Sequence, residues 1–432
     1  MRINSNLQIT PPSCQNSDSQ RNSHLWDVFT ANSTPGFENP LWKFIYFVCS
    51  AILIIAFVIK LVGFIISLGQ PNINDFQYTE LLINFEGGFV RRGLVGQILF
   101  YLSQFFNCSP ILLINIGCIG CFIGILCFLL YKFRLKGLCW WLILTPFLCG
   151  YTSCIIRKDF LCYLIIICIL YSIRTSPLKG INMFWASLLV ILGLFVHEAF
   201  IFYGFPFMAL YCIRFNKSVF KYISILMVIV MFLILCYFKG GPQTPDLIVD
   251  SWNTLYGNDF LKHESWNSIG ALGWPLDFAV NFHLHANFYN PVIGWWQIFV
   301  RILTLIICYI FFINYIWHFE AKNSDKGYWS ARCTIIGFLF LFSIICLLPM
   351  FTVLSCDYPR LYQYAFMATL LPYLTIPVNR LQELIGASLS RCIVKINERL
   401  IIKGKFGIIF CISIMLSYTI VYLLKSTVNQ IL

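Results

Sequence analysis

Long uninterrupted apolar runs alternate with short polar segments along most of the chain after residue 42. Runs of about 20 apolar residues are long enough to cross the hydrocarbon core of a bilayer as helices. They are solid Ile, Leu and Phe stretches without the alternation of a membrane barrel, and a helix satisfies all its backbone groups internally. The pattern predicts an all-α polytopic membrane protein with about 11 spans. These are approximately Lys43–Leu68, Pro110–Tyr131, Gly137–Ser153, Phe160–Ile173, Ile181–Val196, Ala199–Ile213, a segment ending near Phe238, Pro291–Tyr315, Cys333–Leu354, Leu361–Val378 and Gly407–Leu424.

Composition and charge placement add an orientation. The chain is 59% hydrophobic and 11% charged, whereas about a quarter of the residues in a soluble domain are charged. Lys and Arg concentrate in every second connection, and basic loops resist translocation, so those connections are predicted to be cytoplasmic. The amino terminus is then cytoplasmic, and residues 239–290 form a long outer loop between spans 7 and 8. The predicted location is the bacterial inner membrane.

The remaining composition excludes several classes of protein. The net charge of +12 lies in loops rather than in a base-reading stripe, so we expect no nucleic-acid partner. Many of the 19 cysteines lie within apolar runs, where they act as small hydrophobes rather than disulfides or metal ligands. Residues 1–42 are polar and contain no signal-peptide core, so we expect a disordered cytoplasmic tail followed by one transmembrane domain, 43–432.

The predicted outer connections hold an unusual amount of charge for a membrane protein. In the first of them, Arg91 and Arg92 lie within the glycine-rich run Gly87–Gly96. Glycines allow close backbone approach, and paired guanidiniums bind phosphate oxygens bidentately. The alternative is that these arginines reach toward lipid headgroups. We favour an anion-binding role.

Three other short motifs are predicted at the outer face. Arg157-Lys158-Asp159 is either a self-neutralising turn or an anion site. Asp357 and Arg360 either form an internal salt bridge or supply a catalytic acid and a phosphate ligand. His197-Glu198 ends one span against an apolar wall, a position that favours a raised carboxyl pKa and proton transfer; a paired structural glutamate is the alternative.

The long outer loop is rich in aromatic residues, including Trp252, Trp266 and Trp274. Such rings suit a carbohydrate site, although an aromatic belt at the bilayer interface explains them equally well. His283 and His285 have no companion ligands that would indicate a metal, and the chain has no P-loop or Gly-x-Ser-x-Gly motif. We therefore expect neither a metal nor a cofactor.

A reaction at the outer face has no access to cytoplasmic nucleotide-sugars, so a donor linked to a polyprenyl lipid fits better. Arginines would stabilise its diphosphate leaving group, and Asp75 or Glu198 would deprotonate the acceptor hydroxyl.

An outer loop with Asp75 and Gly-Gly-Phe-Val-Arg-Arg-Gly-Leu, followed by the three other motifs, resembles the bacterial O-antigen polymerases. More loosely, it is similar to membrane glycosyltransferases that use polyprenyl-linked sugars. The resemblance covers most of the membrane part and excludes residues 1–42. It implies polymerisation of polyprenyl-diphosphate-linked repeat units at the periplasmic face during lipopolysaccharide biosynthesis, and a chain-length regulator as a partner.

Two functions from other classes compete with the polymerase hypothesis. A flippase or anion transporter would line a path with the same charges, but the sequence has no internal repeat. A membrane acyltransferase that modifies glycans would use His197 as its base.

Overall fold

The computed structural model describes residues 71–133, 155–175, 178–238, 240–285, 294–320, 326–355, 357–403 and 406–411, with single residues between 44 and 68 and at 413 and 414. These segments are helical and contain no strand. The predicted tail 1–42, the predicted span Gly137–Ser153 and most of the first and last predicted spans lie outside them.

The helices follow the apolar runs of the sequence closely. They are α3 (Phe76–Leu81), α4 (Gly93–Phe106), α5 (Pro110–Phe133), α7 (Asp159–Ile173), α8 (Gly180–Val196), α9 (Phe200–Tyr203), α10 (Phe205–Phe215), α11 (Phe220–Tyr237), α12 (Thr244–Tyr256), the 3-10 helix η4 (Gly270–Gly273), α13 (Leu276–Leu284), α14 (Gly294–Tyr315), the π-helix η6 (Ile316–Glu320), α15 (Lys326–Pro349), the π-helix η7 (Met350–Leu354), α16 (Tyr358–Thr375), α17 (Val378–Leu384) and α18 (Ala387–Leu400).

Four stretches of the described chain are long and apolar enough to cross a membrane: Pro110–Lys132, Phe220–Tyr237, Phe299–His318 and Ala331–Leu354. Helices α4, α7, α8 and α10 are apolar but shorter. The chain is thus an all-helical membrane protein in its described part, while the prediction of about 11 spans stays a prediction.

One predicted span is divided. Ala199–Ile213 forms two helices, α9 and α10, that meet at Gly204. Pro206 lies in the first turn of α10, where its missing N–H costs no helical hydrogen bond. A side chain at Gly204 would overlap the Phe200 ring, so the junction needs glycine.

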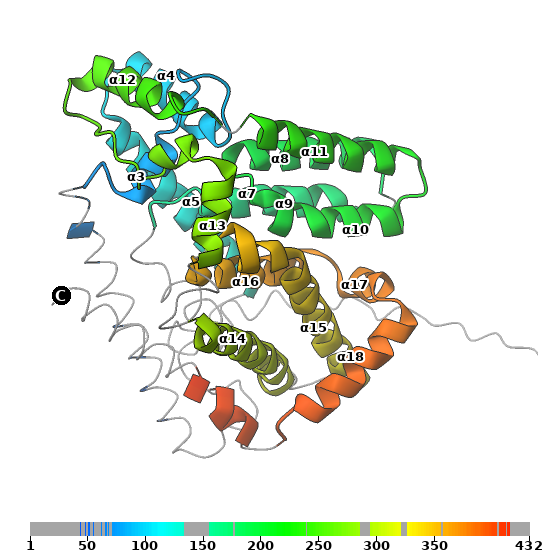
Figure 1. Cartoon of the computed structure of the whole chain (residues 1–432). Coiled ribbons are helices and arrows are strands. Elements are labelled where there is room, and N and C mark those ends of the chain that lie inside the picture. The colour runs from blue at the N-terminus through cyan, green and yellow to red at the C-terminus, as the bar shows by residue number, and fades with distance from the viewer. Residues whose placement is uncertain are drawn as a thin grey trace, which may run out of the picture.

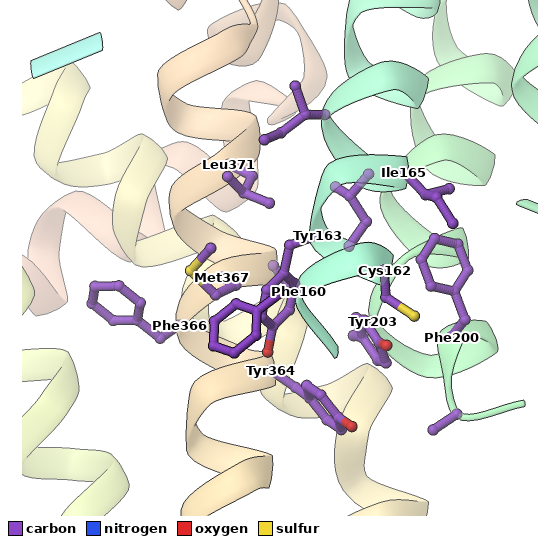
Figure 2. Packing of buried hydrophobic residues seen from close by; sticks show 14 of the residues in the cluster. Phe160, Cys162, Tyr163, Ile165, Phe200, Tyr203, Tyr364, Phe366, Met367 and Leu371 are labelled. Atoms are coloured by element: carbon purple, nitrogen blue, oxygen red, sulfur yellow. The ribbon is translucent and has the colours of Figure 1, made fainter. Parts of the chain in front are cut away.

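The long helices form two groups that meet at α7 and α16 (Figure 1). Helices α7, α8, α10 and α11 lie side by side, and α14, α15 and α16 form the second group. Figure 2 shows Phe160 and Tyr163 of α7 directed toward Tyr364 and Met367 of α16. Tyr364 stacks on Tyr203 with ring centroids 4.2 Å apart. Phe160, Tyr163, Tyr203 and Tyr364 thus form an aromatic layer that joins the two groups of helices.

The two longest predicted outer segments pack on one another at one end of the helices (Figure 1). The indole of Trp252, on α12, is fully buried and donates to the Leu82 carbonyl at 2.8 Å. The Tyr256 hydroxyl donates to the Cys108 carbonyl at 2.9 Å. Buried Trp252 is therefore a packing residue that leaves no ring face for a sugar.

The start of α4 packs directly on the chain that precedes it. A side chain at Gly96 would overlap the backbone of Ile83, whereas one at Gly117, in α5, would meet nothing within 4 Å. We expect Gly96→Ala to destabilise the protein by about 1–3 kcal/mol, because the backbone of residue 83 must shift. Thermal unfolding in detergent measures this, with Gly117→Ala as the control. Equal midpoints for the two variants would contradict the close contact.

Candidate functional site

Charged side chains from five separate segments meet at one end of the helices. We call this group the charged cluster. It contains Glu80, Arg91, Arg92, Lys158, Asp159, His197, Glu198 and Arg360. Segments far apart in sequence meet here because α8 ends where α7 and α16 begin, so the charged ends of these helices share one location.

Glu80 lies at the centre of the charged cluster. It is on α3 and only 2% exposed. Its Oε1 lies 3.3 Å from Lys158 Nζ, 3.4 Å from Arg360 Nη2 and 3.6 Å from Arg92 Nη1. Burial by itself raises the pKa of this carboxyl, but the cations, Arg360 foremost, hold the pKa well below its usual range. Glu80 is therefore ionised and serves as a shared counter-ion.

Arg360 is fixed by a two-pronged pairing at the start of α16. Its Nε and Nη2 donate to the two carboxylate oxygens of Asp159, each at 2.8 Å. The Tyr364 hydroxyl donates to Asp159 Oδ1 at 2.7 Å. This pairing ties Arg360 of α16 to the start of α7, and the Arg360 guanidinium lies over the Tyr364 ring, 5.7 Å from its centroid. Such bidentate pairs constrain orientation as well as charge.

Arg92 and Glu198 form the second strong pair. Arg92 Nε lies 2.7 Å from Glu198 Oε2 and 2.9 Å from Oε1, and Nη2 also contacts Oε1. Arg92 has φ of 67°, in the left-handed region, which costs about 1–2 kcal/mol for a residue with a side chain. The pairing with Glu198 offsets this cost.

Arg91 marks the open side of the charged cluster. Its side chain is 33% exposed, against 1% for Glu80, and its Nη1 lies 3.6 Å from Glu198 Oε1. Its backbone N–H donates to the Phe238 carbonyl at 3.2 Å, which attaches the glycine-rich loop to the end of α11. Its buried Nε has no hydrogen-bond partner among the described residues, so the hydrogen-bonding capacity of this guanidinium is not fully used there.

The prediction of a raised pKa for Glu198 is wrong. Burial raises the pKa of this carboxyl, but Arg92, His197 and Arg91 lower it well below its usual range. His197 Nδ1 lies 3.4 Å from Glu198 Oε2. Burial lowers the pKa of His197 to about 4, so the imidazole is neutral at physiological pH. Glu198 is not a competent base while both arginines are paired with it.

Lys158 is buried, and its ammonium group has a counter-ion but lacks hydrogen bonds. Its Nζ is at ion-pair distance from Glu80 but makes no hydrogen bond among the described residues. Burial lowers its pKa to about 8, against the opposing effect of Glu80.

Neither of the two short motifs with mixed charge is neutralised internally. Arg157 pairs with Asp357, Nη1 to Oδ2, at 3.0 Å, while Lys158 and Asp159 turn to Glu80 and Arg360. Asp357 and Arg360 therefore do not form the predicted salt bridge with each other. Asp357 pairs with Arg157 and Arg360 pairs with Asp159 instead. Asp357, 41% exposed, lies at the outer margin of the charged cluster.

Asp75 is not brought into the charged cluster. It is exposed and accepts a hydrogen bond from the Asn72 amide at 2.7 Å. Glu80, on α3 and five residues after Asp75, takes the central position instead. A signal for it existed in the sequence, because Glu80 is a carboxylate immediately before the apolar residues Leu81, Leu82 and Ile83.

The charges balance inside the cluster but not at its open side. In the interior, Lys158 and Arg360 face Glu80 and Asp159, which leaves no excess. At the open side Arg91 faces Glu198, which also pairs with Arg92, and Arg92 in addition lies 3.6 Å from Glu80. With His197 neutral, the four cations and three carboxylates of the charged cluster leave one positive charge. This arrangement favours the approach of an anion. The described residues contain no group of three or more side chains placed to hold a metal ion.

The aromatic residues of the outer loop divide into buried and exposed sets. Trp266, 65% exposed, and Trp274 lie with ring centroids 5.5 Å apart, and Phe282 contacts both. His283 lies in the last turn of α13, which follows the two tryptophans in the sequence. Burial lowers the pKa of His283, and the charges of Arg92 and Arg91 lower it further, so the end of α13 is within electrostatic reach of the arginines.

No protein-family model, curated protein or solved structure matches this chain. The charged cluster and the sequence motifs that form it are therefore the features that bear on function.

Removing the central carboxylate should destabilise the whole site. Glu80→Gln leaves three buried cations with too little negative charge, at a cost of about 3–5 kcal/mol. Glu383→Gln is the control, because Glu383 pairs with Arg380 at an exposed position, where a pair contributes about 0–1 kcal/mol. Thermal unfolding and abundance in membranes are the measurements. Equal behaviour of both variants would remove Glu80 from its central role.

The depressed pKa of His197 predicts acid sensitivity. The unfolded state binds a proton near pH 6.5 and the folded state only near pH 4, so unfolding is favoured as pH falls through this window. Between pH 6.5 and 5 the free energy of unfolding should fall by about 2 kcal/mol. In His197→Gln the loss should be much smaller, whereas exposed His263→Gln should behave as wild type. A parallel pH dependence in His197→Gln, measured by denaturant titration, would contradict a buried neutral imidazole.

Proposed function

We propose that this chain is a membrane glycosyltransferase of the polysaccharide-polymerase type, acting on polyprenyl-diphosphate-linked oligosaccharide at the periplasmic face. The observation that carries the proposal is the excess cation at the open side, Arg91 with Arg92, backed by an interior in which the charges balance. A diphosphate is a dense anion that two guanidiniums bind well.

The pairing of the arginines with Glu198 suggests how the base is activated. A bound diphosphate competes for Arg91 and Arg92, and each contact it takes removes a cation that depresses the pKa of Glu198. The pKa of this carboxyl then rises toward a useful value only when a donor is present. His197 lies beside this carboxyl, with Nδ1 3.4 Å from Glu198 Oε2, and as a neutral imidazole adds no cation that would lower the pKa of Glu198.

The transfer step is a substitution at the anomeric carbon of the lipid-linked sugar. The acceptor hydroxyl oxygen forms the new glycosidic bond, and its proton passes to Glu198. The bond between the anomeric carbon and the phosphate oxygen breaks, and the electron pair leaves with the polyprenyl diphosphate. Arg91 and Arg92 stabilise the negative charge that develops there.

The apolar surroundings of the loop suit a donor that arrives within the bilayer. Phe89, two residues before Arg91, is 43% exposed and contacts Phe195 and Phe238 at the ends of α8 and α11. A lipid-linked donor would place its diphosphate beside the arginines and its chain along such a surface.

Arg91→Ala should abolish chain elongation without loss of protein from the membrane, because Arg91 is half-buried and contributes little to the paired interior. Arg91→Lys should retain part of the activity, since it keeps the charge but loses bidentate geometry. The readout is surface-glycan length on gels, with abundance measured in parallel. Arg174→Ala, an exposed arginine at the other end of α7, is the control. Normal glycan length in Arg91→Ala would exclude the diphosphate role.

Deletion of the gene separates this function from its rivals. Loss of the polymerase leaves a single repeat unit on each lipid core. Loss of all surface glycan would instead support a flippase, and glycan of normal length without an acyl group would support an acyltransferase.

A further inference from the structure

Helix α18 crosses the second group of helices instead of running along it (Figure 1). Its buried side includes Ile393 and Asn397, which lie over Gly337 of α15. Asn397 Oδ1 accepts from the Tyr309 hydroxyl of α14 at 2.8 Å. Because α14 and α15 contain two of the candidate membrane spans, a helix that crosses them lies roughly in the membrane plane.

The exposed side of α18 carries two parallel strips. At 100° per residue, Leu389, Cys392 and Ile396 form an apolar strip next to the buried side. Leu389 is 47% exposed and Ile396 41% exposed.

The second strip is basic and lies beyond the apolar one. It holds Arg391, Lys395 and Arg399, all exposed, with Glu398 as the acid among them. Three cations and one anion leave a net charge of +2. Arg214, at the end of α10, donates to the Glu383 carbonyl of the adjacent α17 and adds a further cation on this side.

We infer that α18 is an in-plane interfacial helix whose exposed side binds an anionic phospholipid surface. An apolar strip beside a row of Lys and Arg is the pattern of helices that lie in the headgroup region. The apolar strip enters the acyl boundary while the cations contact lipid phosphates. A protein partner that covered the apolar strip would also cover the basic strip beside it. The basic strip offers such a partner no apolar contact. This inference is independent of the proposed transferase activity.

Native Cys392 reports directly on the apolar strip. The full chain is reconstituted in nanodiscs of phosphatidylcholine alone or with phosphatidylglycerol, and labelled with an uncharged polyethylene-glycol maleimide. Peptide mass spectrometry gives the labelling rate at each cysteine. Ser388→Cys places a matched thiol on the exposed side of α18 within the basic strip. A third protein, with Arg391, Lys395 and Arg399 changed to Gln, removes the cations and keeps the apolar strip.

We expect Cys392 to react on the order of tenfold more slowly than Ser388→Cys with phosphatidylglycerol present. Removing that lipid, or the three cations, should speed labelling of Cys392 several-fold. Equal rates at the two positions would overturn the inference. So would slow labelling of Cys392 that depends on neither phosphatidylglycerol nor the cations, because a protein surface would then cover the strip.

Discussion

The ionised carboxylate of Glu80 is the constraint on which the arrangement of the charged cluster depends. A charge buried this deeply is tolerated only when cations surround it, and Glu80 obtains them from three other segments. Arg92, Lys158 and Arg360 are in turn tolerated because Glu80 and Asp159 are there. The contacts of Glu80 therefore tie α3 and the glycine-rich loop to the starts of α7 and α16. None of these segments could bury its charges without the others.

The solvent exposure of the charged cluster increases from its buried interior toward Arg91. The aromatic layer and the Asp159–Arg360 pair hold the deep part, whose charges cancel. Arg91, Arg92 and Glu198 lie further out, where the balance is positive and solvent reaches the side chains. Because the interior charges balance by themselves, an anion can replace Glu198 as the partner of Arg91 and Arg92 without disturbing the interior pairs. The buried cations then keep their counter-ions and do not repel one another. In the proposed transferase, that exchange would couple donor binding to proton transfer.

The charge placement also divides the molecule into two unlike ends. At one end, acids and bases pair into a site with few free charges. At α18, the cations stay exposed beside apolar side chains and outnumber the acids of that helix. A membrane protein retains an exposed basic row most easily where headgroup phosphates can meet it.

The sequence by itself determined the helical membrane architecture, because long apolar runs admit no other backbone arrangement in lipid. It also identified most of the cluster, since Arg91, Arg92, Lys158, His197, Glu198 and Arg360 stand out as charges between apolar runs. Only the tertiary structure decided the pairings, which join residues as far as 280 positions apart. Local spacing suggested Asp357 with Arg360 and a protonatable Glu198. The helix ends instead oppose Asp159 to Arg360 and two arginines to Glu198, which reverses the direction of the pKa shift expected for that carboxyl. Glu80 takes the position predicted for Asp75 because packing buries Glu80 within α3 and leaves Asp75, just before α3, exposed.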